Sequence, residues 1–235
     1  FAQARKEIQT SLGSGVLISN RGHVLTNNHV IEGADQIQVL MADGRSARAE
    51  VVGTDLDTDL AVLQISIDDL PGIVIGTSRR LRVGDVVLAI GNPFGVGQTV
   101  TSGIISATGR DHLGITAYAA INPGNSGGAL INTHGELIGI NSAIYSKSGG
   151  SMGIGFAIPI SLAKGVMTQI IENGYVIRGW LGIEAQDMTP QLAKSIGLPF
   201  RQGMLIGTVI KNGPAAEAGL MPGDIVVAIN GKPVK

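Results

Sequence analysis

A serine flanked by glycines is the strongest chemical signal in the sequence. Ser126 lies in the run Asn122-Pro123-Gly124-Asn125-Ser126-Gly127-Gly128, where glycines allow a sharp turn and bring backbone N–H groups close to a bound oxygen. Such a loop suits a nucleophilic hydroxyl with an oxyanion hole. An isolated match of this kind is equally typical of a surface turn, so the residues that would activate the serine must decide.

A serine hydroxyl becomes a good nucleophile only when a neighbouring base takes its proton. Of the four histidines, His23, His112 and His134 fall in polar turn segments typical of exposed side chains. His29 instead follows the apolar segment Val24-Leu25-Thr26, so we expect it at the end of a strand. His29 is therefore the candidate base, and a structural core histidine is the alternative.

The candidate acid is Asp59, which directly precedes the apolar segment Leu60-Ala61-Val62-Leu63. A partly buried carboxylate needs hydrogen-bond partners, and an imidazole supplies one. Asp55 and Asp57 are alternatives for which a turn-capping role is expected.

Chain order separates two classes of serine hydrolase. In α/β-hydrolases the acid and the histidine follow the serine, but after Ser126 comes only His134, with no acid between them. A lipase-like esterase therefore lacks its histidine. The order His29, Asp59, Ser126 is that of chymotrypsin-like peptidases, in which we expect His29 Nδ1 to face Asp59 and His29 Nε2 to face Ser126.

Short β-branched segments punctuated by glycine predict a mostly β fold. They span residues 16–18, 37–39, 61–65, 86–90 and 137–140. Turn signals at residues 20–22, 43–44 and 133–135 predict antiparallel hairpins. We therefore expect a chymotrypsin-like double β-barrel protease domain over residues 1–175.

One amphipathic helix is expected to close this domain. Pro159 opens an apolar pattern of helical period that runs from Ile160 to Ile171, and Asn173-Gly174 ends it. Residues 176–235 then form a smaller mixed unit. Its strands are expected at residues 180–185, 204–210 and 225–229, with short helices after Pro190 and at 215–218.

The composition limits partners and cofactors. Hydrophobic residues make up 44% and charged residues 15% of the 235 residues, which favours a compact fold over disorder. The net charge of −1 gives no broad attraction for nucleic acid or anionic lipid. The absence of cysteine removes disulfides and thiolate metal sites, and we expect no metal and no other cofactor. No apolar run is long enough to span a membrane, so membrane attachment is expected only through an N-terminal anchor cut from this chain.

The chain resembles the HtrA/Deg family of serine proteases in six ordered blocks. These are Leu12-Gly13-Ser14-Gly15-Val16, Thr26-Asn27-Asn28-His29-Val30, Thr58-Asp59-Leu60-Ala61-Val62-Leu63, Ala89-Ile90-Gly91-Asn92-Pro93, Gly124-Asn125-Ser126-Gly127-Gly128 and Gly153-Ile154-Gly155-Phe156-Ala157-Ile158-Pro159. The resemblance implies a catalytic triad of His29, Asp59 and Ser126. It also implies an oxyanion hole made by the backbone N–H groups of Gly124 and Ser126.

Residues 97–110 and 176–183 look most like the DegS/AlgW branch of this family. The resemblance implies a homotrimeric periplasmic endopeptidase, tethered to the inner membrane, that senses envelope stress. Its implied substrate is a membrane anti-sigma factor, cleaved when the PDZ domain binds C-terminal peptides of misfolded outer-membrane proteins. The DegP/DegQ proteases of general quality control share every catalytic block and are the alternative, together with a catalytically silent peptide-binding module.

The resemblance implies a peptide site in the second unit. A PDZ domain adds a peptide as an extra strand and captures its terminal carboxylate with backbone N–H groups. The family's carboxylate-binding loop falls on Trp180, Leu181, Gly182 and Ile183; alone, this tetrapeptide is typical of a strand start. Because the chain stops at Lys235, we expect only the N-terminal part of a PDZ domain in residues 176–235.

Three expectations concern the substrate side of the site. The apolar Ile140 and residues 154–156 favour small or medium apolar side chains at P1. The family has a longer loop before the nucleophile, so residues are expected to be missing between Tyr118 and Ala119. In a resting form, the Gly124 N–H is expected to point away from the oxyanion hole.

Overall fold

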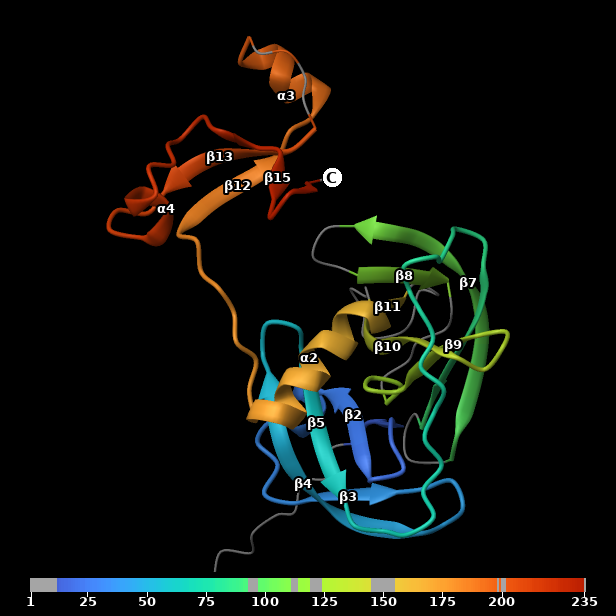
Figure 1. Ribbon diagram of the computed structural model, residues 1–235. Helices are drawn as coiled ribbons and strands as arrows, with labels where there is room; N and C mark the ends of the chain where they lie inside the picture. The colour runs from blue at the N-terminus through green and yellow to red at the C-terminus, as the bar shows by residue number, and fades with distance from the viewer. Residues whose placement is uncertain are drawn as a thin grey trace, which may run out of the picture. The chain divides into compact units, whose positions relative to one another are not determined.

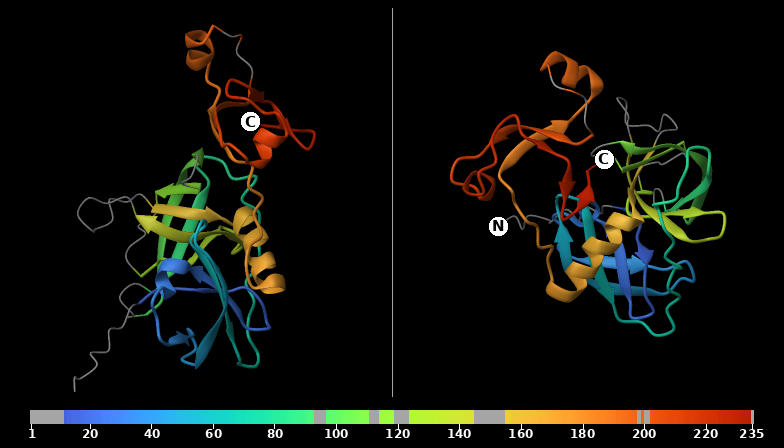
Figure 2. Two further views of the ribbon diagram at one scale, coloured as in Figure 1. Left: turned by 90° about the vertical axis from the view of Figure 1, so that its left-hand side faces the viewer. Right: turned by 45° about the horizontal axis from the view of Figure 1, so that its top comes forward.

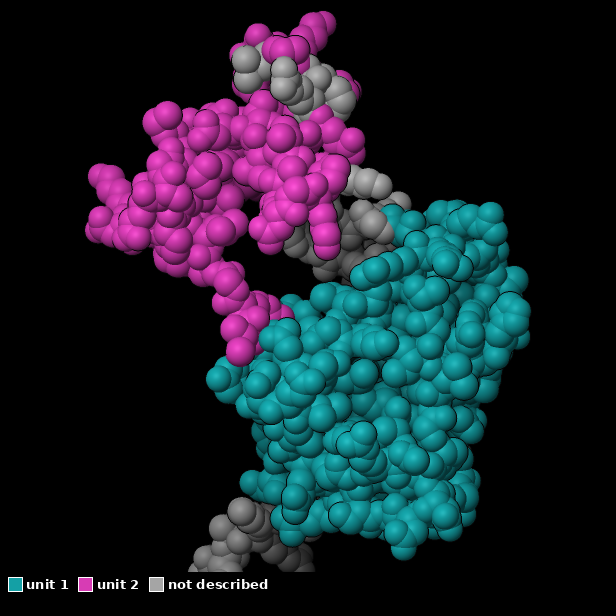
Figure 3. Space-filling view, viewed as in Figure 1, with its two compact units in different colours: residues 1–176 teal, residues 177–235 magenta. Residues whose placement is uncertain are grey.

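The computed structural model describes residues 12–92, 97–110, 114–118, 124–144, 155–197, 199 and 202–234. The chain divides into two compact units, residues 1–176 and residues 177–235 (Figure 3). In the described part of the chain, no helix is long and apolar enough to cross a membrane.

The first unit begins with an antiparallel five-stranded sheet (Figure 1). Its order is β1 (Val16–Leu17), β2 (His23–Asn27), β5 (Leu60–Ile65), β4 (Ser46–Asp55) and β3 (Ile37–Leu40). The predicted turns at residues 20–22 and 43–44 join β1 to β2 and β3 to β4 as hairpins. Within the described residues, the edge strands β1 and β3 do not pair with each other, so the sheet forms a half-barrel.

Six strands of the first unit form a closed barrel. Their order is β10 (Leu137–Ile144), β11 (Gly155–Pro159), β8 (Gly114–Tyr118), β7 (Thr99–Arg110), β6 (Val86–Gly91) and β9 (Ala129–Asn132). In β6, buried residues alternate with more exposed ones, as expected when one face of a strand lines a core. That core comprises Val87, Ala89, Ile105, Leu130, Ile138 and Ala157. The predicted mostly β, chymotrypsin-like class is confirmed.

Helix α2 (Ile160–Asn173) matches the predicted helix in position and in both end signals. Gly174 adopts φ 82° after its last residue and donates its N–H to Ile170 O, an αL C-cap. Pro159 offers no side-chain cap, so the first N–H groups need another acceptor. Ser78 supplies one: its Oγ accepts from Ser161 N at 3.1 Å and donates to Ser161 Oγ at 2.7 Å.

The buried face of α2 joins the open sheet to the barrel. Ile160, Ala163, Val166, Met167 and Ile170 share one core cluster with Leu25, Leu60 and Val62 of the sheet and Leu137 and Ile140 of the barrel. Figures 1 and 2 show α2 lying across strands of both. This shared core fixes the two β structures relative to each other, which matters because the candidate site residues come from both.

The second unit has a small three-stranded antiparallel sheet and two short helices. The sheet is β12 (Ile183–Asp187), β13 (Met204–Val209) and β14 (Ile225–Val226), and β15 (Ala228–Ile229) pairs with β16 (Lys232–Pro233). The helices are α3 (Pro190–Ser195) and α4 (Pro214–Glu217). The predicted elements are confirmed with two differences. Residues 180–182 precede the strand in which they were expected, and the strand expected at residues 225–229 is divided into β14 and β15, which belong to different sheets.

Candidate active site

The pairing of β2 with β5 brings His29 and Asp59 together. Asn27, the last residue of β2, pairs with Leu60, the first residue of β5, so the segment after β2 lies beside the residue before β5. His29 lies in the short helix α1 (Asn28–Ile31) that follows β2 directly. Asp59 has φ 54°, a left-handed conformation that aspartate adopts more often than most residues. Its carbonyl oxygen accepts from the Asn27 side chain at 2.9 Å, which holds the two segments in place.

Three hydrogen bonds converge on the Asp59 carboxylate. The His29 N–H donates to Oδ1 at 3.0 Å, His29 Nδ1 lies 2.7 Å from Oδ2, and the Ser142 hydroxyl donates to Oδ2 at 3.2 Å. Because an ionised carboxylate only accepts, Nδ1 carries the proton and Nε2 keeps its lone pair. The side chains of His29 and Asp59 are 46% and 33% exposed, so a substrate can reach the imidazole.

His29 and Asp59 shift each other's pKa in the directions that favour the ion pair: the pKa of His29 is raised and that of Asp59 is lowered. The hydrogen bond to Asp59 raises the pKa of His29 above its ordinary value of 6.5, against burial, which lowers it. Burial raises the pKa of Asp59, but the hydrogen bonds from the His29 side chain and backbone outweigh it and hold that pKa below its ordinary value. Asp59 is therefore ionised wherever His29 is neutral.

The raised pKa of His29 gives a prediction for the pH dependence of hydrolysis. Only neutral imidazole accepts a proton, so kcat/KM is expected to rise with pH through the His29 pKa, and its midpoint should lie above 6.5. Initial rates on a peptide substrate across a pH series measure it. An acid limb with its midpoint at or below 6.5 would show that the Asp59 contact does not govern His29 in the free protein.

Ser126 lies in a loop whose glycines are required by close packing. We call residues 124–128 the nucleophile loop. A Cβ on Gly127, which has φ 82°, would lie 2.2 Å from both Ser14 O and Thr26 Oγ1, and a Cβ on Gly128 would lie 2.1 Å from Ile90 O. The two glycines after Ser126 therefore let the loop press against β2 and β6 without an intervening side chain.

The Ser126 hydroxyl donates to the backbone oxygen of Ser142 in β10, at 2.7 Å. A serine hydroxyl has one proton, so this geometry excludes donation to His29 Nε2 and differs from the expected contact. The Ser142 hydroxyl in turn contacts Asp59, so Ser142 connects the serine to the His29 and Asp59 pair. Rotation of Ser126 between staggered χ1 positions would redirect its hydroxyl. In this structure the Ser126 hydroxyl therefore donates to Ser142 O and not to His29.

Three successive carbonyl groups of the nucleophile loop accept hydrogen bonds. Gly124 O accepts from Ser14 Oγ at 2.6 Å, Asn125 O from Gly128 N at 2.9 Å, and Ser126 O from Ser14 N at 2.9 Å. Among the backbone hydrogen bonds of the described residues, none has the N–H of Gly124 or Ser126 as its donor. The expected orientation of the Gly124 N–H depends on the peptide bond to residue 123, which lies outside the described residues.

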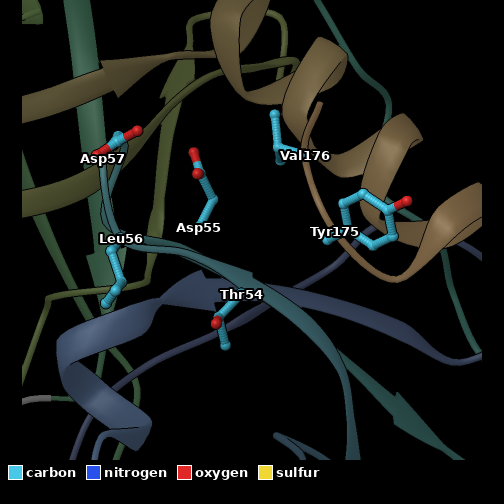
Figure 4. A pocket seen from close by; sticks show the side chains of 6 residues that line it. All are labelled: Thr54, Asp55, Leu56, Asp57, Tyr175 and Val176. Carbon is cyan, nitrogen blue, oxygen red and sulfur yellow. The ribbon is translucent and has the colours of Figure 1, made fainter. Parts of the chain in front are cut away.

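The alternative acids Asp55 and Asp57 lie at a different surface. Both line a shallow hollow with Thr54, Leu56, Tyr175 and Val176 (Figure 4). Asp55 is buried and accepts a hydrogen bond from the Thr58 hydroxyl, which is the expected turn-capping role. The hydrogen-bond partner of His29 is Asp59, the preferred candidate.

The expectation for the P1 pocket is wrong at Ile140. This residue is fully buried in the core cluster beneath α2, because it faces inward from β10 and cannot meet a substrate. Of the other residues in that expectation, Ile154 lies outside the described residues, whereas Gly155 is buried and Phe156 half-buried in β11. Ala119 also lies outside the described residues, and with it the expected gap after Tyr118. No group of three or more potential metal ligands occurs among the described residues.

In the second unit, the predicted peptide site lies at the start of an edge strand. Ile183 begins β12, which pairs with β13 on one side only. Gly182 has φ 74°, and a Cβ there would lie 3.3 Å from the Trp180 ring. Trp180 and Leu181 are 61% and 54% exposed. The segment therefore combines a strand edge without a partner among the described residues, a left-handed glycine and exposed apolar side chains.

The sequence matches the trypsin-like peptidase domain family over residues 13–140 and the PDZ domain family over residues 205–235. A protein of Marinomonas sp. (strain MWYL1), named a probable periplasmic serine endoprotease of DegP-like type, is 51% identical; the alignment covers 96% of this chain and 50% of that protein. A protein of the same name from Hahella chejuensis is 49% identical over 95% of this chain and 49% of its own length. The chain spans about half the length of these curated relatives.

Solved structures of similar sequence include the HtrA-type protease AlgW with a decapeptide and with a tripeptide. Both are 58% identical to this chain. The decapeptide complex has a TM-score of 0.82, and the match covers 95% of this chain and 71% of that structure's chain. The tripeptide complex has a TM-score of 0.86, with 94% of this chain and 76% of its own chain covered. A serine endoprotease from Yersinia pestis is 49% identical, with a TM-score of 0.73, 94% of this chain covered and 74% of its own. The chain therefore belongs to the HtrA family, which joins a trypsin-like serine peptidase domain to a PDZ domain, and within it to the DegS/AlgW branch.

Proposed function

We propose that this chain is a serine endopeptidase in which Ser126 is the nucleophile, His29 the general base and Asp59 the residue that orients the base. The observation that carries the proposal is the 2.7 Å contact between His29 Nδ1 and Asp59 Oδ2, which leaves Nε2 unprotonated. The contacts of Ser142 with Asp59 and with Ser126 support the inclusion of the serine in the same site.

In the acylation step, the Ser126 hydroxyl leaves Ser142 O and turns to His29. Its Oγ attacks the carbonyl carbon of the scissile peptide while its proton passes to His29 Nε2. The carbonyl oxygen becomes an oxyanion, which the N–H groups of Gly124 and Ser126 stabilise. His29 then gives the proton to the leaving amine, so that the peptide C–N bond breaks and an acyl ester on Ser126 remains. The Asp59 carboxylate stabilises the imidazolium that forms between these transfers.

Deacylation reverses the roles with water as the nucleophile. His29 Nε2 accepts a proton from the water while the water oxygen attacks the ester carbonyl carbon. The N–H groups of Gly124 and Ser126 stabilise the second oxyanion. Collapse of the intermediate returns the proton from His29 to Ser126 Oγ and releases the new carboxyl terminus. No metal or other cofactor enters these steps.

We further propose that the protein works in the bacterial periplasm as an envelope-stress sensor. The match to AlgW structures with bound peptides and the periplasmic names of its relatives support this. Its substrate would be a membrane anti-sigma factor, its activators C-terminal peptides of outer-membrane proteins, and its form a homotrimer tethered to the inner membrane. The DegP-like names favour general protein quality control as the second candidate.

Peptide-dependent hydrolysis distinguishes these candidates. A sensor is expected to cleave the periplasmic segment of an anti-sigma factor only when a peptide with a free C-terminal carboxylate is added, and to leave casein intact. A quality-control protease would degrade casein without peptide, and a silent binding module would cleave neither. A control peptide amidated at its C-terminus should fail to activate, because backbone N–H groups prefer the carboxylate.

A charge at Leu181 tests the proposed peptide site. Leu181→Glu should weaken peptide binding and peptide activation by about tenfold, because the new carboxylate repels the peptide's own at a cost near 1.4 kcal/mol. Fluorescence anisotropy of a labelled peptide measures the affinity. Leu162→Glu is the matched control: Leu162 is 48% exposed on α2 and its replacement should leave binding unchanged. Equal affinity in both variants would remove residues 180–183 from the peptide site.

A further inference from the structure

Ser14 contacts the nucleophile loop through both its side chain and its backbone. Its Oγ donates to Gly124 O at 2.6 Å, and its N–H donates to Ser126 O at 2.9 Å. The residues on either side of Asn125 are thus held by one partner from a segment more than a hundred positions earlier in the chain. The proposed mechanism assigns no role to Ser14.

Ser14 is itself held by both β structures of the first unit. The Ser14 Oγ accepts from Asn92 N at 2.7 Å, directly after β6 of the barrel. The Ser14 carbonyl oxygen accepts from Thr26 Oγ1 in β2 at 2.7 Å. Since α1 with His29 follows β2, these contacts connect the nucleophile loop to the strand that leads into the proposed base.

The surroundings leave the Ser14 hydroxyl little freedom. A Cβ on Gly91 would lie 2.9 Å from Ser14 Oγ and 2.5 Å from Asn125 Oδ1. The Ser14 hydroxyl donates to Gly124 O and accepts from Asn92 N–H. Replacement of Ser14 by alanine would therefore remove the hydrogen-bond partner of both groups. A backbone group that is left without a hydrogen-bond partner is costly, so Gly124 O and Asn92 N–H would shift until each has another partner.

We propose that Ser14 is a positioning residue that fixes the nucleophile loop with the N–H groups of Gly124 and Ser126 free for the oxyanion. Ser14 holds the carbonyl groups of these same two residues. The Gly124 carbonyl shares its peptide plane with the Asn125 N–H, and the Ser126 carbonyl shares its plane with the Gly127 N–H. Ser14 therefore holds the two planes on either side of the plane that carries the Ser126 N–H. If these two planes lose their donors and turn, the plane between them moves and the Ser126 N–H is displaced. Oxyanion donors act only when they are aimed at the charge that develops. This role rests on the proposed function, and Ser14 acts through the loop without touching the substrate.

The test compares Ser14→Ala with Ser78→Ala. Ser78 is a matched control, because its Oγ also accepts one backbone N–H and donates to one oxygen, but at the start of α2. Ser14→Ala should lower kcat by about 10²-fold, the order expected for small misplacement of catalytic groups, with KM little changed. Ser78→Ala should leave kcat unaltered. Amide hydrogen exchange should accelerate at Gly127 and Gly128 only in the Ser14 variant. The Gly128 N–H donates to Asn125 O within the nucleophile loop, and the Gly127 N–H joins this loop to Asn141 O of β10, so both bonds depend on the position of the loop.

Three outcomes bear on the proposal separately. Unchanged kcat together with unchanged exchange in Ser14→Ala would overturn it, as would equal loss of kcat in Ser78→Ala. If Ser14→Ala does not fold, Ser14→Cys replaces the hydroxyl by a thiol, which is a much weaker donor and acceptor and is too large for contacts of 2.6 and 2.7 Å. Its kcat should therefore fall and exchange at Gly128 should accelerate, and a folded variant with unchanged values of both would overturn the role. A wild-type protein that hydrolyses nothing refutes the proposed peptidase function, whereas the exchange rates still report whether Ser14 holds the loop.

Discussion

Replacement of Ser126 by alanine is expected to abolish peptide hydrolysis, with a loss of kcat on the order of 10⁶-fold. The reason is that Ser126 Oγ is the only side-chain nucleophile in the proposed mechanism. Release of a chromogenic leaving group from a peptide substrate measures the rate. Titration with denaturant should show that the free energy of unfolding changes by less than about 1–2 kcal/mol.

The small change in stability follows from the site itself. Alanine removes one hydroxyl, whose only described hydrogen bond is the one to Ser142 O, and a single neutral hydrogen bond contributes about 1 kcal/mol net. A variant that loses much more stability would assign Ser126 a structural role. A variant that keeps its hydrolytic rate would remove Ser126 from the mechanism.

Asp59→Asn is expected to lower turnover by about 10⁴-fold while the fold is kept, as in the corresponding change in chymotrypsin-like peptidases. The carboxylate accepts the Nδ1 proton at 2.7 Å and so leaves Nε2 free as a base. An asparagine amide donates to Nδ1 instead, which moves the proton to Nε2 and disables it. The His29 N–H donates to the other carboxylate oxygen, Oδ1, and keeps the amide oxygen as its acceptor. The Ser142 hydroxyl donates to the same Oδ2 that faces His29 Nδ1, so it loses this one acceptor while the backbone contact is kept.

The pH profile and a matched control sharpen this prediction. The hydrogen bond to the Asp59 carboxylate is the main interaction that raises the pKa of His29. In Asp59→Asn this pKa should therefore be lower, and the residual activity should rise with pH at a lower midpoint than in the wild type. Asp57→Asn changes the same group two positions away, at the hollow beside Tyr175, and should keep wild-type turnover. Near-normal turnover in Asp59→Asn would instead direct attention to Asp55 or Asp57.

Much of the fold is visible in the sequence because its signals are local. The strands near residues 37–39, 61–65 and 86–90 are β-branched runs, and they fold as β3, β5 and β6. Helix α2 has a proline at its start and a glycine in αL conformation at its end. Such signals act within a few residues of one another, so single-sequence reasoning detects them.

Strands held mainly by their neighbours are harder to predict. β7 spans Thr99–Arg110, a segment rich in Gly, Ser and Thr that resembles a loop by composition. It is a strand because β6 and β8 pair with it on both sides, and such pairing depends on residues far apart in the sequence.

The candidate site shows the same division. His29 and Asp59 could be selected because each lies at the end of an apolar strand, and the strand register then brings them into contact. The contact between Ser126 and Ser142 O could not be anticipated, since every residue has a backbone oxygen and no sequence signal marks one as an acceptor. In the sequence, Ser14 stands out only as a member of the block at residues 12–16 that resembles the family. The positioning role proposed for it rests on hydrogen bonds that only the structure reveals.

Covalent labelling with a fluorophosphonate, followed by mass spectrometry of the digested protein, tests the central claim most directly. The reagent phosphonylates only a serine that a neighbouring base activates and whose oxyanion site is formed. We predict a single labelled position, Ser126, at a rate that rises with pH through the His29 pKa and is lost in Ser126→Ala. Labelling at another serine, or no labelling of the wild-type protein in the presence of an activating C-terminal peptide, would contradict the assignment of Ser126, His29 and Asp59 as the catalytic site.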